Sequence, residues 1–107
     1  MLEIIEKILL QVPRYTEIYV FGSVLKSFHP NDLDILVIYD SNIYPNANIY
    51  SACESICTVL YETFNLPLDL TVLSYSENDS INFDKEVKAI KLQYFLQRTL
   101  LKRKLQQ

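Results

Sequence analysis

Two short apolar segments separated by one long helical segment constrain the fold of this chain more than any other feature. Residues 32–39 and 68–73 are rich in Leu, Ile and Val, and each has the length of a buried strand. Residues 49–64 lie between them and repeat apolar side chains at helical spacing, namely Ile49, Cys53, Ile56, Leu60 and Phe64. Because a strand, a helix and a strand normally form a right-handed crossover, we expect the two strands to be parallel.

A helix, a further strand and a short helical segment are expected before this unit. Residues 17–21 are β-branched and aromatic, as in a buried strand, and a helix at 2–12 precedes them and ends at Pro13. Gly22 and Ser23 then turn the chain into a short helical segment at about 23–27. The link to the next strand is short, so we expect the first two strands to pair in an antiparallel or mixed arrangement.

The remaining third of the chain is predicted to be a polar link followed by one helix. The link covers residues 74–82, and the helix covers about 84–105 with an apolar stripe of Val87, Ile90, Tyr94, Leu101 and Leu105. With 107 residues, the chain fits one domain spanning 1–107. The predicted fold is α/β, a small mixed β-sheet with helices packed on it.

Three aspartates lie on or beside the predicted strands. Asp32 and Asp34 begin one strand, and Asp69 lies in the next with apolar neighbours. Side chains alternate along a strand, so Asp32 and Asp34 point the same way, about 7 Å apart. Neighbouring carboxylates repel unless a cation lies between them, and Mg²⁺ prefers such ligands. If the strands are neighbours, Asp69 completes a cluster suited to two-metal phosphoryl or nucleotidyl transfer.

Gly22 is the only glycine of the chain, and it follows a strand directly. A residue without a side chain allows backbone N–H groups to approach an anion closely. Ser23 adds a hydroxyl donor and Lys26 a positive charge. Together they predict a cradle for the distal phosphates of a nucleoside triphosphate. The Walker pattern GxxxxGK[ST] is absent.

Each of these features also has an ordinary structural explanation. Gly22 fits a turn at a strand end, Asp32 can cap a turn, and Asp69 can face solvent on an edge strand. It is their combination in this order that favours a nucleotide and metal site.

The combination resembles the DNA polymerase β-type nucleotidyltransferase superfamily, most closely its minimal members, over about residues 15 to 73. The matching motifs are Phe21-Gly22-Ser23, Asp32-Leu33-Asp34 and Leu68-Asp69-Leu70. The resemblance implies that Gly22 and Ser23 hold the triphosphate and that Asp32 and Asp34 bind Mg²⁺ or Mn²⁺. It also implies that Asp69 joins one metal and accepts the proton of the nucleophile. Departures from the family pattern are Lys26, Ser27 and Asn31, where Arg, Gly and Ser are common.

The activity implied by this resemblance is transfer of a nucleoside monophosphate, AMP from ATP, to an acceptor with release of pyrophosphate. Small members of the family often act as antitoxins beside a helical HEPN toxin, so such a protein is an expected partner. A second copy of the chain is the other expected partner. The alternative is a non-catalytic module of the same fold that neutralises a partner by occlusion.

Charge and composition exclude some other classes. The net charge is −3, but residues 1–83 carry eleven acids against three bases, whereas residues 84–107 carry seven bases against two acids. An acidic body makes general nucleic-acid binding an unfavourable interpretation, and the basic segment fits a solvated helix face. No apolar run is long enough for a bilayer, and early glutamates argue against a signal peptide, so we expect a cytoplasmic protein.

The two cysteines are expected to be buried apolar side chains. Cys53 and Cys57 lie four residues apart in the predicted helix, and His29 is distant in sequence. No second pair of Cys or His residues completes a tetrahedral metal site.

Overall fold

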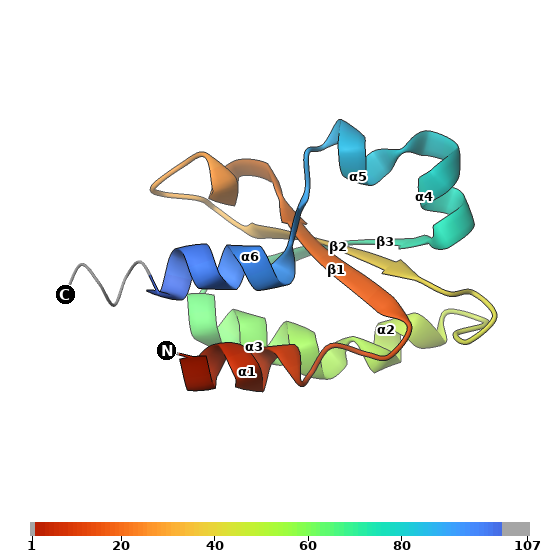
Figure 1. Cartoon of the computed structure of the whole chain (residues 1–107), viewed down its shortest axis with the longest axis horizontal. Helices are drawn as coiled ribbons and strands as arrows, with labels where there is room; N and C mark the ends of the chain where they lie inside the picture. The colour runs from red at the N-terminus through yellow and green to blue at the C-terminus, as the bar shows by residue number, and fades with distance from the viewer. Residues whose placement is uncertain (1, 102–107) are drawn as a thin grey trace.

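The strands form one mixed sheet with helices on both faces (Figure 1). The computed structural model describes residues 2–101. Within this range the elements are α1 (Leu2–Leu9), β1 (Thr16–Phe21), the 3₁₀ helix η1 (Gly22–Leu25), β2 (Leu33–Tyr39), α2 (Asn48–Ala52), α3 (Glu54–Phe64), β3 (Leu68–Ser74), α4 (Tyr75–Ile81), α5 (Phe83–Glu86), β4 (Ile90–Lys91), α6 (Leu92–Leu96) and the π-helical turn η2 (Gln97–Leu101). The sheet order is β3-β2-β1-β4.

The strand pairings confirm the expected topology. β2 and β3 are parallel, with Ile35 beside Leu70, and α2 and α3 make the crossover between them. β1 pairs antiparallel with β2, placing Val20 opposite Ile35. The central position of β2 explains its nearly continuous apolar sequence, because both of its faces are covered along most of its length.

The main core lies between the sheet and the layer formed by α1, α3 and α6, below the sheet in Figure 1. Leu33, Ile35 and Val37 of β2 are buried in this core. Alternation along the strand places Asp34, Leu36 and Ile38 on the opposite face. The far part of that face is covered by α4 and α5, and Leu36 and Ile38 are buried there.

The prediction of one helix over about 84–105 is wrong in its described part. α5 ends at Glu86, Lys88 adopts a left-handed conformation with φ of 54°, and Ile90–Lys91 forms β4 against β1. This short strand gives hydrogen-bond partners to the otherwise open edge of β1, which a continuous helix would leave unpaired. The predicted stripe fails with the helix, since Tyr94 is exposed, and the residues buried instead are Leu92, Phe95, Leu96 and Leu100. Leu105 lies outside the described residues.

The predicted polar link at 74–82 is also wrong, because most of it forms the helix α4. Its start is fixed by a capping box between Ser74 and Glu77. The Ser74 hydroxyl accepts the Glu77 backbone N–H at 3.1 Å, and the Glu77 carboxylate accepts the Ser74 N–H at 2.8 Å. These two bonds satisfy backbone donors that would otherwise be unpaired at a helix start.

The other helices bury apolar faces at helical spacing, as predicted, but they begin or end at different residues than predicted. The segment at 49–64 is divided at Cys53 into α2 and α3, but four of its five predicted core positions are buried and Phe64 is half-buried. The first helix ends at Leu9 rather than at Val12, and Ile8 is buried whereas Leu2 is exposed. The short helical segment starts one residue earlier than predicted, at Gly22.

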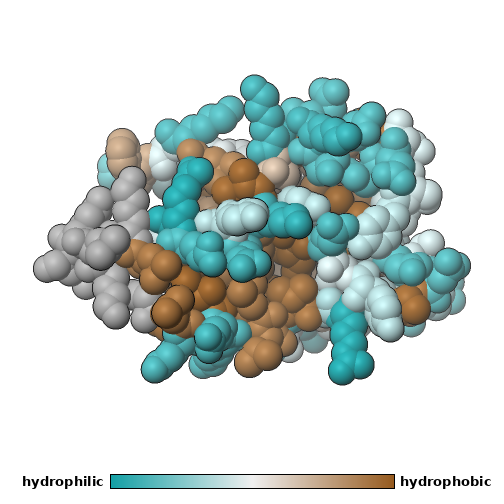
Figure 2. Space-filling view, viewed as in Figure 1, coloured by the Kyte–Doolittle hydropathy of each residue, from teal (hydrophilic) through white to brown (hydrophobic). Residues whose placement is uncertain are grey.

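Part of the surface over α1 and α6 is apolar (Figure 2). Leu2, Ile4 and Leu10 are 61%, 41% and 81% exposed. An exposed apolar area of this kind is typical of surfaces that contact another macromolecule. No helix within residues 2–101 combines the length and the apolar character needed to cross a membrane.

Candidate functional site

The three aspartates singled out in the sequence converge at one end of the sheet. One carboxylate oxygen from each of Asp32, Asp34 and Asp69 lies within 4.8 Å of the other two. Asp34 and Asp69 are direct partners in the parallel pairing of β2 and β3, and Asp32 immediately precedes β2. Strand alternation and the crossover therefore bring together acids that are far apart in sequence.

The cluster concentrates negative charge at the sheet end. Asp32 and Asp34 are partly buried, and Asp69 is exposed. Burial is the first cause of a raised pKa at Asp34, and the charges of Asp32 and Asp69 and a hydrogen bond with Asp69 raise that pKa further. A cation between the carboxylates would relieve this repulsion. The donor set of three carboxylates with a half-open surface suits a hard divalent ion such as Mg²⁺.

Gly22 makes room for the central carboxylate of the cluster. Its φ is +82°, and a Cβ atom built there would lie 2.0 Å from Oδ2 of Asp34. The neighbouring Phe21 is opposite Asp34 in the antiparallel pairing of β1 and β2, which explains this approach. The position therefore requires glycine for two reasons, a left-handed backbone and the absence of a side chain.

Ser23 and Lys26 follow Gly22 in the chain and have exposed side chains. Both are exposed, Ser23 in η1 and Lys26 directly after it. The Ser23 carbonyl accepts the N–H groups of Lys26 at 3.0 Å and of Ser27 at 2.8 Å, which holds this turn together. Of the residues predicted for the site, the structure thus brings the three aspartates together and places Gly22 against Asp34, whereas Ser23 and Lys26 are exposed residues of the segment after Gly22.

The electrostatic strain at Asp34 can be tested without any ligand. Asp34→Asn is expected to raise the melting temperature of the metal-free protein near neutral pH. The pKa of Asp34 is raised in the fold, so the folded state favours the protonated carboxyl group. The stability that this gives is fully present below the pKa of the unfolded state and is lost as the pH rises through the pKa of the folded state. Asparagine keeps the shape and carries no charge, so the variant avoids this loss.

Thermal unfolding in the presence of a chelator, from about pH 4 to about pH 8, measures the effect. The gap between the variant and the wild-type protein should widen with pH. A variant that melts at or below the wild-type temperature at neutral pH would show that the carboxylates do not destabilise one another.

The cysteines and His29 stay apart from the cluster. Cys53 is buried, with its thiol pKa raised to about 11 by burial, and Cys57 is half-buried with a pKa raised for the same reason. Both therefore stay protonated and behave as apolar side chains, as the sequence predicts. Among residues 2–101, the aspartate cluster is the one group with metal-ligand geometry.

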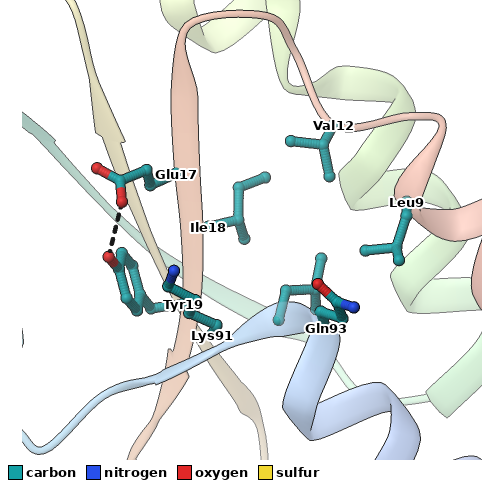
Figure 3. A pocket seen from close by; sticks show the side chains of 8 residues that line it. Leu9, Val12, Glu17, Ile18, Tyr19, Lys91 and Gln93 are labelled. Carbon is teal, nitrogen blue, oxygen red and sulfur yellow. Dashed lines mark hydrogen bonds between the residues drawn. The ribbon is translucent and has the colours of Figure 1, made fainter.

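A separate hollow lies on the other side of β1, away from β2 (Figure 3). Its volume is about 170 Å³, and its walls are mainly the apolar side chains of Leu9, Val12, Ile18 and Leu92. At its rim the Tyr19 hydroxyl donates to the Glu17 carboxylate at 3.0 Å, and burial and this bond raise the pKa of Tyr19 to about 12. Tyr19 is therefore a neutral donor here, and this hollow lacks the chemistry of the aspartate cluster.

The sequence reasoning missed the role of Gly22 toward Asp34. From the residues alone, Gly22 is expected only to let backbone groups approach a phosphate. Antiparallel pairing of the two strands could have indicated this contact, because it places Asp34 opposite Phe21, the residue before Gly22. The link length alone does not determine the register, so the contact required the structure.

A comparison with models of protein families identifies a family for this chain. Residues 2–103 match the family model described as a nucleotidyltransferase domain. A crystal structure from Sulfolobus solfataricus, of a protein proposed to be a nucleotidyltransferase, is similar at 23% identity and a TM-score of 0.43, covering 83% of this chain and 72% of that one. A comparison with curated protein sequences gave no match. Since the family model spans nearly the whole chain and the aspartate cluster is intact, this chain belongs to the nucleotidyltransferase domain family.

Proposed function

We propose that this chain transfers a nucleoside monophosphate from a nucleoside triphosphate, ATP in the first instance, to an acceptor. The observation that carries the proposal is the convergence of Asp32, Asp34 and Asp69 within 4.8 Å, beside a glycine that the site requires. Family membership supports the same reaction class. The overall change is attack of an acceptor oxygen on the α-phosphorus, cleavage of the bond to the β-phosphate, and release of pyrophosphate.

Asp32, Asp34 and Asp69 are the residues that would hold Mg²⁺ or Mn²⁺. A bound divalent ion supplies charge neutralisation at the phosphate oxygens and lowers the pKa of the attacking hydroxyl. A consequence that does not depend on activity is that Mg²⁺ should raise the melting temperature of the wild-type protein and leave that of Asp34→Asn nearly unchanged.

The chain's own groups would perform three tasks. The backbone N–H groups at Gly22 and Ser23, with the Ser23 hydroxyl, donate hydrogen bonds to phosphate oxygens, and Lys26 adds a positive charge. Asp69 is the exposed acid of the cluster, and it accepts the proton of the attacking hydroxyl. Asp34 stays ionised between its two neighbours once their repulsion is relieved.

The acceptor we propose is a protein, either a helical toxin of the HEPN type or a second copy of this chain. The support is the resemblance noted in the sequence and the apolar surface with Leu2, Ile4 and Leu10 exposed. The competing proposal is a non-catalytic module that binds such a partner and blocks it. The intact aspartate cluster favours the enzyme.

Intact-mass spectrometry tests the proposal directly. The protein is incubated with each nucleoside triphosphate and Mg²⁺ or Mn²⁺, alone and with the product of the adjacent gene. We expect a mass increase of one nucleoside monophosphate on one of the two proteins, absent when Asp32→Ala/Asp34→Ala replaces the wild-type chain. No adduct, together with equal partner binding by both forms, would contradict the enzyme and favour the non-catalytic module.

A further inference from the structure

The two edges of the sheet differ in how well they are protected from pairing with another strand. β4 forms one edge, and it has only two residues, of which Lys91 is exposed. Short edge strands and lysine side chains are common means of preventing edge-to-edge association. β3 forms the other edge with seven residues, Leu68–Ser74, and it contains no lysine, proline or bulge. Among residues 2–101, β3 pairs with β2 alone, so its outer side has no strand beside it.

The backbone groups on the outer side of β3 belong to every second residue. The Leu33 N–H donates to the Pro67 carbonyl at 2.9 Å, so the Pro67 carbonyl points toward β2. Bonding alternates from residue to residue along a parallel pair, so Pro67 and every second residue after it bond to β2. The N–H and C=O groups that point outward are therefore those of Leu68, Leu70 and Val72.

An antiparallel pair of β3 strands centred on Leu70 satisfies all of these outward groups. It places Leu70 opposite Leu70 of the second copy, and Leu68 opposite Val72 of the second copy. Each such pair is of the hydrogen-bonded kind, in which the two residues exchange both N–H···O bonds. The arrangement has a two-fold axis, which is the commonest symmetry of homodimers.

The side chains of β3 suit the same register. Leu68, Leu70 and Val72 are partly buried against the main core, and the pairing places these apolar side chains opposite one another. Asp69 is the one charged residue of the strand, and it falls opposite Thr71 of the second copy. A threonine hydroxyl can donate to a carboxylate, so the register pairs the charge with a donor instead of with a second carboxylate.

A shallow hollow of about 520 Å³ extends from the start of β3 onto α3. Its lining includes Cys57, Tyr61, Pro67 and Leu68, and Tyr61 is 53% exposed. A strand that pairs beside Leu68 adjoins this hollow. The association would therefore remove apolar side-chain surface from water in addition to satisfying backbone groups.

We propose that two copies of this chain associate through their β3 strands, antiparallel about Leu70, so that two four-stranded sheets become one continuous sheet. Any extended peptide offers backbone groups, but a second β3 also supplies the matching side chains, apolar opposite apolar and Thr71 opposite Asp69. The inference is independent of the proposed function, because it needs neither a metal nor a nucleotide. It places Thr71 of the second copy beside an acid of the candidate site.

Sedimentation velocity from about 1 to about 500 μM, with a reducing agent, measures the association. We expect the wild-type chain to dimerise. Leu70→Pro removes the outward N–H and keeps the bonds to β2, since an edge strand tolerates proline where its N–H faces solvent. It should raise the dissociation constant at least about a hundredfold, because two carbonyl groups at the centre of the pairing lose their donors.

Two control variants separate the backbone effect from others. Leu70→Ala also removes the leucine side chain but keeps the N–H, so it should weaken the dimer much less than Leu70→Pro does. Leu10→Lys places a charge on the exposed apolar surface of α1 and should leave the dimer unchanged.

Hydrogen exchange gives a second measurement on the wild-type chain. The amides of Leu70 and Val72 face outward, so they should exchange rapidly at low concentration and become protected as the dimer forms. The amide of Thr71 bonds to β2 and should be protected at both concentrations.

Three outcomes would overturn the inference. The first is a wild-type chain that stays monomeric over the whole range, and the second is a dimer that Leu70→Pro weakens no more than Leu70→Ala does. The third is a dimer that Leu10→Lys abolishes, which would assign the interface to α1. None of them bears on the proposed function, which Mg²⁺ binding and intact mass test separately. Circular dichroism checks the fold of Leu70→Pro. If that variant does not fold, Leu70→Lys replaces it with the same expectation, because it places like charges opposite each other.

Discussion

Asp34→Asn should reduce nucleotide transfer by at least about a thousandfold while the fold persists. Asp34 is the central acid of the cluster, paired with Asp69 across the strands and two residues from Asp32. Asparagine keeps the shape and removes the charge that would hold the cation. Loss of several kcal/mol of charge stabilisation in the transition state corresponds to a factor of this size, since about 4 kcal/mol equals a thousandfold.

Pyrophosphate release, with the acceptor identified by mass spectrometry, measures this effect. The control is Asp79→Asn, an exposed acid on α4 outside the cluster, which should retain full activity. Activity of Asp34→Asn within about tenfold of wild type would contradict the assignment of the site.

Gly22→Ala is expected to destabilise the fold by more than about 2 kcal/mol and to weaken Mg²⁺ binding. The new methyl group meets two obstacles, the left-handed φ of +82° and the Asp34 carboxylate at 2.0 Å. Relieving the clash moves the carboxylate away from its position near Asp32 and Asp69. Gly22→Val is expected to be worse, because a β-branched residue fits positive φ less well.

A double-mutant cycle separates the two obstacles. Asp34→Ala removes the carboxylate that the new Cβ would meet, so Gly22→Ala should cost less in that background than in the wild type. Urea unfolding gives the four free energies, and Mg²⁺ titration of the single variant gives the effect on the site. An equal cost in both backgrounds would mean that only the backbone conformation demands glycine, with no role in admitting Asp34.

The parts of the fold that could be predicted are those controlled by long periodic segments. The crossover between 32–39 and 68–73 follows from strand and helix periods, and with it the meeting of Asp34 and Asp69. That pairing depends on the direction of the strands, which the helix between them implies, and on the alternation of side chains along each strand. The convergence of the three acids was therefore predictable, whereas their roles in catalysis stay predictions.

The parts that could not be predicted depend on short or irregular segments. β4 has only two residues, and it follows a left-handed Lys88 that helical periodicity cannot reveal. A surface hollow of about 580 Å³ is lined by the loop 27–31 together with Phe64, Phe95 and Thr99, and this meeting of segments far apart in sequence is not visible in any local pattern. In contrast, α4 was predictable, because Ser74 and Glu77 have the spacing of a capping box. The Ser- and Asn-rich composition of the segment instead suggested a polar link.

The position of Asp69 on an edge strand also affects the stability of the fold. β3 is the outermost strand on its side of the sheet, and Asp69 lies about 35 residues from Asp34 along the chain. A cation shared by these two acids would act as a crosslink that closes the whole crossover through α2 and α3. Edge strands are the parts of a sheet that open most readily, so occupancy of the site would suppress local unfolding of β3. Binding at the site and local unfolding of β3 would then be linked, so that each shifts the equilibrium of the other.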